Sequence, residues 1–170
     1  DQAMVDFSVG SNLASSSAIV VDGVAPTVAS VKSTSTNTTY GTGASINITV
    51  NFSESVTLSS SSSMTVYLNS ATDRTVSITS ISSTSSASGT YTVVDGDASG
   101  DLSVDSIAVS SGASLSDAAG NAMSSFSVPA DSNLSDFNAI VINTTKPSTP
   151  LGFAVNSNYG SVGLAWTAVS

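Results

Sequence analysis

Strict alternation of apolar and polar residues marks the clearest element of the chain. In S-I-N-I-T-V-N-F the apolar residues Ile46, Ile48, Val50 and Phe52 are separated by Asn and Thr. A period of two places successive side chains on opposite faces, so this segment predicts a β-strand with one buried and one solvated face. The same period predicts further strands at Met64–Leu68, Val76–Ile78 and Tyr91–Val93.

One segment changes phase within itself. In L-S-V-D-S-I-A-V the apolar positions move from Leu102 and Val104 to Ile107 and Val109. One extra residue in a strand of an antiparallel pair produces such a shift. We therefore expect a β-bulge near Asp105–Ser106.

Turn-forming residues divide the chain into short elements. We expect turns at Tyr40–Gly43, Asp95–Gly100 and Asp117–Gly120, where Gly, Asp and Asn cluster. No stretch shows helical periodicity over three turns. We also expect serine-rich loops at Ser59–Ser63 and Ser82–Ser88, and outer strands at Pro26–Val31 and Ala139–Ile142. About seven short strands separated by turns predict an all-β fold, an antiparallel sandwich of immunoglobulin type.

Part of the sequence occurs twice. Ala3–Pro26 resembles Ala122–Pro147, and the equivalent prolines, Pro26 and Pro147, are 121 positions apart. That spacing is about one β-sandwich domain. We therefore expect residues 1–25 to end one repeat, residues 26–147 to form a complete repeat, and the chain to be a segment of a longer polypeptide. Repeats joined end to end are typical of spacers, stalks and fibres.

Composition narrows the classes of function. The chain carries 12 acidic residues against three basic ones, a net charge of −9, and lacks both Cys and His. Phosphate binding requires clustered Lys and Arg, so nucleic acid is not an expected partner. Without His there is no Ser-His-Asp triad. No run of about 18 apolar residues occurs, so we expect no membrane insertion.

Two segments resemble known families. Tyr40–Glu54, Y-G-T-G-A-S-I-N-I-T-V-N-F-S-E, resembles the bacterial Ig-like (cadherin-like) repeat of large surface adhesins, and D-R-T, D-A-A-G-N-A, A-I-V-I and N-T-T-K-P match it further along, in order. Residues 148–170, with L-G-F-A-V and S-V-G-L-A-W-T-A, resemble the linker and first strands of a fibronectin type III domain, where Trp166 would lie in the core. The first resemblance implies an extracellular or bacterial cell-surface location and calcium at domain junctions.

Four residues are expected to meet where the chain enters the complete repeat, which we call the entry pole. In an Ig-like topology Glu54 ends a strand there, Asp117 and Asn121 lie in a turn, and Asp22 lies in the incoming linker. Calcium takes six to eight oxygen ligands, which carboxylates, Asn and backbone carbonyls supply. The alternative is a simple Asp-Gly-Asn turn beside a solvated strand end.

A weaker acidic set is expected at the opposite end, the exit pole. In D-G-D-A-S-G-D, Asp95, Asp97 and Asp101 are spaced partly like an EF-hand loop, but the twelfth position is Ser106 rather than Glu. The alternative is an acidic turn. Asn143 and Lys146 reduce the negative charge nearby, so we expect the entry pole to bind calcium better. Acid catalysis of glycoside hydrolysis would need a cleft, and no sequence feature builds one.

We therefore expect no enzyme but an extender or stalk segment of a bacterial adhesin or fibre, whose partners are neighbouring repeats. Three alternatives remain. The first is a module that binds glycan or protein through a polar face. The second is a filament subunit completed by strand addition from a neighbour, with self-association into fibres. The third is an accessory domain of a secreted hydrolase.

Overall fold

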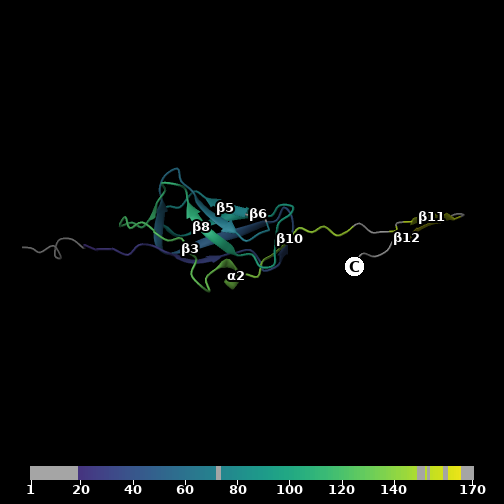
Figure 1. Ribbon diagram of the computed structural model, residues 1–170, viewed down its shortest axis with the longest axis horizontal. Helices are drawn as coiled ribbons and strands as arrows, with labels where there is room; N and C mark the ends of the chain where they lie inside the picture. Colours follow the sequence, from purple (N-terminus) through teal and green to yellow (C-terminus); the bar gives the residue numbers. More distant parts are fainter. Residues whose placement is uncertain (1–18, 72–73, 149–151, 153, 159–160, 166–170) are drawn as a thin grey trace, which may run out of the picture.

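The computed structural model describes residues 19–71, 74–148, 152, 154–158 and 161–165 (Figure 1). Almost all regular structure in these residues is β, which confirms the expected all-β class. No described helix is long and apolar enough to cross a membrane. The elements are β1 (Val28–Lys32), β2 (Thr39–Tyr40), β3 (Ser45–Leu58), β4 (Met64–Leu68), β5 (Arg74–Ile78), β6 (Thr84–Thr92), β7 (Ala98–Ser99), β8 (Val104–Val109), β9 (Leu115–Ser116), α2 (Leu134–Phe137), β10 (Val141–Asn143), β11 (Ala154–Asn158) and β12 (Ser161–Ala165).

Two antiparallel sheets form the body of the molecule. In the first, β3 lies between β1 and β6, and the far end of β3 pairs with β9. In the second, β4 lies between β5 and β8. A small third sheet places β10 between β2, which is parallel to it, and β7, which is antiparallel. The β11–β12 hairpin pairs with itself and lies apart from the two sheets (Figure 1).

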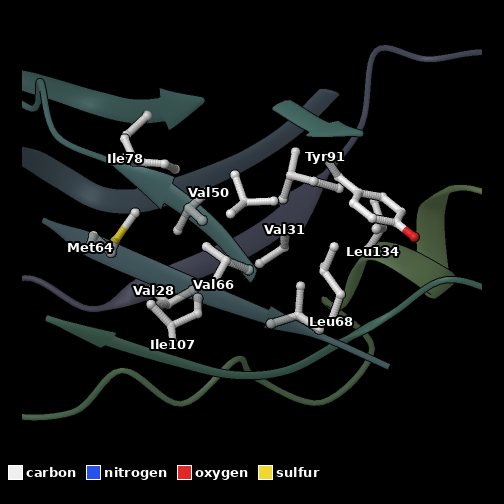
Figure 2. Packing of buried hydrophobic residues seen from close by; sticks show 14 of the residues in the cluster. Val28, Val31, Val50, Met64, Val66, Leu68, Ile78, Tyr91, Ile107 and Leu134 are labelled. Carbon is white, nitrogen blue, oxygen red and sulfur yellow. The ribbon is translucent and has the colours of Figure 1, made fainter. Parts of the chain in front are cut away.

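The two larger sheets face each other across one apolar core. Val31 and Val50 of the first sheet point toward Met64, Val66 and Ile107 of the second (Figure 2). All five side chains are buried. Burial of such a side chain stabilises the fold by about 1.5–3 kcal/mol relative to exposure. The core therefore holds the two sheets together without a disulfide.

Two predictions drawn from periodicity are confirmed. In β3 the residues Ile46, Ile48, Val50 and Phe52 are all buried, and the polar residues between them are not. In β8 the register with β4 moves from Tyr67↔Ser106 to Leu68↔Val104, so that Asp105 has no partner. Asp105 is thus the extra residue of the expected bulge.

Two expectations from sequence are corrected, and one further element appears. Glu54 does not end its strand, because β3 continues to Leu58. Ser82–Ser88 is not a loop, because most of it belongs to β6, whose serines are exposed while backbone pairing with β3 holds the strand. The short helix α2 was not expected. Asn133 caps its first turn, and Asp136 accepts a hydrogen bond from the Asn133 backbone in return.

The chain enters and leaves the two-sheet body at opposite ends. The segment before β1 approaches from the left of Figure 1, and the segment after β10 departs to the right. The turn after β9 lies with the incoming segment, since Asn121 Nδ2 donates to the Asp22 carbonyl oxygen at 3.2 Å. The loop before β7 lies with the outgoing segment, since Gly96 N donates to Thr144 Oγ1 at 3.1 Å. The two predicted acidic sets thus belong to opposite poles.

Gly89 of β6 offers a test of the core packing. A methyl group added there would overlap Val76 Cγ1 and crowd Ile78, and both belong to β5. We expect Gly89→Ala to lower the free energy of unfolding by about 1–3 kcal/mol, because overpacking forces neighbours out of place. Gly100→Ala is the matched control, since nothing lies near its added methyl. Equal urea midpoints for the two variants would contradict this packing.

Candidate metal centre

Three separate segments build the entry pole. The incoming segment is fixed to β3 by two hydrogen bonds: Ser53 N donates to the Thr27 carbonyl at 3.0 Å, and Thr27 N donates to Ser53 Oγ at 3.0 Å. The far end of β3 pairs with β9, so Thr57 lies opposite Ser116. Asp117 follows directly after β9. Strand pairing therefore brings Asp22, Glu54 and Asp117 to one end of the molecule from three places in the sequence.

A bulge in β3 presents Glu54. The pairing with β6 moves from Asn51↔Ser86 to Val56↔Thr84, so Phe52–Ser55 stands opposite Ser85 alone. The extra residues bend the strand locally. Glu54 takes the alternating position between buried Phe52 and buried Val56 but is itself partly exposed. The bulge thus holds a carboxylate at the edge of the core, where an apolar residue would otherwise continue the pattern.

The three carboxylates converge. One oxygen each from Asp22, Glu54 and Asp117 lies within 4.8 Å of the other two. Calcium–oxygen bonds measure about 2.3–2.6 Å, so two oxygens on one ion lie at most about 5 Å apart. The spread of the three oxygens is therefore compatible with a shared cation. Among the described residues, no other acidic side chains form a group of three this close.

Asn121 organises this site as a hydrogen-bond donor. Its backbone N and side-chain Nδ2 each donate to one Asp117 carboxylate oxygen at 2.8 Å, and Nδ2 also donates to the Asp22 carbonyl. Val24 N donates to Asp22 Oδ1 at 3.0 Å. The sequence predicted Asn121 as a direct ligand. The structure places Asn121 beside Asp22 and Asp117, and its side-chain nitrogen donates a hydrogen bond to each of them.

The electrostatics favour an added positive charge. Partial removal from water, and then the nearby carboxylates of Asp22 and Asp117, raise the pKa of Glu54. Desolvation also opposes ionisation of Asp117, but hydrogen bonds from Asn121, Gly120 and Ala119 hold its pKa below the usual value. Asp117 therefore stays ionised beside a carboxylate that its charge repels. A divalent cation among the three would remove this repulsion.

The donor set suits a hard cation. Three carboxylates supply three to six oxygens, depending on whether each binds through one or both. Calcium takes six to eight oxygens and tolerates irregular geometry, whereas Mg²⁺ demands a near-ideal octahedron. The remaining ligands would come from water, backbone carbonyls or a neighbouring domain. The residues present thus fit a hard divalent cation, and calcium makes the looser demand on their geometry.

The expected exit-pole set does not form. Asp97 is 0% exposed, and its carboxylate accepts hydrogen bonds from Arg74 Nε at 2.6 Å, Tyr91 Oη at 2.7 Å and Val94 N at 2.9 Å. Asp95 is instead exposed and pairs with Lys146 Nζ at 3.3 Å, and Asp101 is exposed. Asp95 and Asp97 have different partners, and the three aspartates do not form a converging group among the described residues, so the structure does not bring the expected exit-pole set together.

Asp97 is instead the centre of a buried polar network. Burial, and then the hydrogen bond to Asp97 and its negative charge, raise the pKa of the Tyr91 hydroxyl. Asp97 also accepts from Thr144 Oγ1 through its backbone carbonyl at 2.8 Å. The network therefore ties β5 and β6 to the outgoing linker. Sequence reasoning missed Arg74 and Tyr91, although a single Arg with an Asp-rich turn elsewhere in the chain was a signal for an ion pair.

No protein-family model, curated protein or solved structure matches this chain. The internal repeat and the geometry of the two poles are thus the observations that bear on function. Of these, the convergent carboxylates at the entry pole have the most specific chemistry.

We expect Glu54→Gln to raise the melting temperature of the metal-free protein at pH 7. A raised pKa means that the folded state disfavours ionised Glu54, and this penalty is fully present above the folded pKa. The gain should vanish below the ordinary value of 4.5, where Glu54 is protonated in both states. Thermal unfolding in EDTA at pH 7 and pH 3.5 measures this. A gain that is equal at both pH values would contradict the repulsion.

We expect Asp97→Asn to lower the free energy of unfolding by about 2–4 kcal/mol, because it removes the charge that pairs with Arg74 and leaves buried donors without an acceptor. Asp95→Asn is the matched control. It breaks an exposed pair with Lys146 and should change stability by no more than about 0.5 kcal/mol. Urea unfolding of both variants decides the matter, and similar losses would show that the Asp97 network is not structural.

Proposed function

We propose that this chain is an extender segment of a bacterial surface or secreted protein, built from Ig-like repeats and stiffened by calcium at the entry junction. One observation carries the proposal. Asp22 belongs to the incoming linker, whereas Glu54 and Asp117 belong to the two-sheet body, and their carboxylates converge. A cation bound there would tie the linker to the domain that follows.

The direction of the chain supports an extended role. The linker enters at one end of the two-sheet body and leaves at the other (Figure 1). Units connected in this way join end to end, so each adds its length to the whole. The repeated sequence, with Pro26 and Pro147 at equivalent positions 121 residues apart, supports a series of such units. The function is then mechanical, the holding of a distal domain away from the cell.

Calcium would act through charge and through linkage. Without a cation, the carboxylate of Asp22 is repelled by Glu54 and Asp117, which favours movement of the linker away from the body. With a cation, the same three groups become ligands and hold the linker in one position. Since the cation binds the folded state only, it also stabilises the fold. Extracellular modules bind calcium with a Kd of about 10⁻⁴–10⁻³ M, which suits a location outside the cell.

The exit junction supports the same role by other means. Thr144 Oγ1 donates to the Asp97 carbonyl and accepts from Gly96 N, and Lys146 pairs with Asp95. These contacts fix the outgoing linker directly. The linker equivalents of Thr144 and Lys146 at the entry are Gly23 and Ala25, which cannot make such contacts. The proposed extender therefore adds a cation to the contacts of Ser53 and Asn121, at the junction where the Thr144 and Lys146 contacts have no equivalent.

We expect millimolar calcium to raise the melting temperature of this chain above its value in EDTA. At a calcium concentration of 100 times Kd, the gain in unfolding free energy is about 2.7 kcal/mol. Glu54→Ala and Asp117→Ala should each abolish the rise, because each removes one of the three convergent carboxylates. Differential scanning calorimetry with isothermal titration measures both effects.

Asp101→Ala is the control for general charge effects. It removes an exposed carboxylate at the opposite pole, so it should keep the calcium-dependent rise. A rise that persists in Glu54→Ala and Asp117→Ala would place the cation elsewhere. Absence of both the rise and the heat of binding would remove the calcium mechanism and leave a metal-free spacer.

A further inference from the structure

Three consecutive apolar residues lie uncovered just before the entry pole. Ile19, Val20 and Val21 are 59%, 87% and 89% exposed. No other run of consecutive exposed large apolar residues occurs in the described chain, although Val155 and Leu164 lie opposite each other in the β11–β12 hairpin. A contiguous exposed apolar segment marks an interaction site more often than single residues do.

The sequence repeat contains a second copy of this segment, and two apolar side chains of that copy are buried. A-I-V-V at Ala18–Val21 is equivalent to A-I-V-I at Ala139–Ile142, again 121 positions on. In the second copy Ile140 is 0% exposed and Ile142 is 2% exposed. In the second copy Ala139 is exposed and Val141 is partly buried, so the difference between the copies lies mainly at the two isoleucine positions. The exposed copy therefore has the sequence of a segment whose two isoleucine side chains are buried in its second occurrence.

The structure also defines the slot that covers this strand. β10 lies between β2 and β7, with Val141 opposite Thr39, and Ile142 opposite both Tyr40 and Ser99. Val141 N donates to the Thr38 carbonyl at 3.1 Å, and the Ile140 carbonyl accepts from Leu102 N at 2.8 Å. The slot thus requires apolar side chains at the first and third positions. Ile19 and Val21 supply them.

We propose that Ile19–Val21 is a completing strand, which docks in the slot between a β2-type and a β7-type strand of a repeat that lacks its own last strand. The docked strand gains backbone hydrogen bonds on both sides and buries Ile19 and Val21, as in β-strand addition. The partner is thus another copy of this repeat with an open slot. The proposal deepens the extender function by naming the partner of the incoming segment, and it needs no metal.

An intact molecule offers no open slot. Its own β10 is covalently attached and so competes at high effective concentration. Exchange would expose Ile140 and Ile142 as much as it buries Ile19 and Val21, so it yields no net burial. Opening the slot changes this balance. Each molecule then carries one free strand and one empty slot at opposite poles, and such head-to-tail contacts form open chains.

A disulfide trap in the full chain tests the docking. The slot is opened by Ile140→Asp with Ile142→Asp, and cysteines are introduced by Val20→Cys and Thr39→Cys into a chain that has none. Since Val20 is equivalent to Val141, which pairs with Thr39, the two cysteines meet only when the strand docks in register. Within one molecule they lie at opposite poles. We expect a several-fold larger ladder of linked oligomers from the opened chain than from the closed chain with the same cysteines.

A peptide keeps the test decisive if the opened chain folds poorly. A synthetic peptide of residues 17–25 should restore the β-sheet circular dichroism and raise the melting temperature of the opened chain. The same peptide with Ile19→Asp and Val21→Asp should not. All samples contain EDTA, so failure of the calcium mechanism leaves this result unaffected. Equal ladders from opened and closed chains, or no ladder together with no rescue, would overturn the proposal.

Discussion

The pairing of β3 is the constraint on which the rest of the structure depends. This one strand pairs with β1 and β6 along its first part and with β9 at its far end. It carries buried side chains along nearly its whole length, from Ile46 to Leu58. The pairing with β1 fixes the incoming linker, and the pairing with β9 fixes the turn that contains Asp117. The entry pole is therefore a consequence of how β3 is paired.

Local patterns in the sequence predicted what local physics determines. The alternation in Ile46–Phe52 and the change of phase around Asp105 each depend on which face of one strand is buried. Both could therefore be predicted without knowing which strands pair with them. Ser82–Ser88 was misread because its serines carry no such pattern. It is a strand only because β3 supplies hydrogen bonds along its length. Long-range strand pairing overrides local composition there, and such pairing cannot be read from a single sequence.

The same distinction separates the two poles. Asp22, Glu54 and Asp117 were predicted to converge because chain topology alone brings their segments together, and they do. The Asp95–Asp101 set failed for a reason that topology does not contain: Arg74, 23 residues before Asp97, draws that carboxylate into the core. Arg74, Tyr91 and Val94 N donate to the buried Asp97 carboxylate, and these hydrogen bonds offset the cost of removing its charge from water. Whether a carboxylate binds another side chain or a cation depends on which partners lie near it in the fold, and the spacing of acidic residues along the sequence does not reveal those partners.

The incoming and outgoing linkers differ at few positions, but those positions determine which contacts each linker makes. At the exit, Asn143 and Thr144 form side-chain hydrogen bonds within the linker and to the Gly96–Asp97 loop. At the equivalent entry positions the chain has Asp22 and Gly23. Replacing Thr by Gly removes the clamp, and replacing Asn by Asp adds the charge that a cation requires. Both linkers keep the internal hydrogen bond at this position, since Val24 N donates to Asp22 Oδ1 as Thr145 N donates to Asn143 Oδ1. Ser53 and Asn121 already hold the entry linker to the body that follows it, so the added carboxylate lies where a cation would reinforce existing contacts.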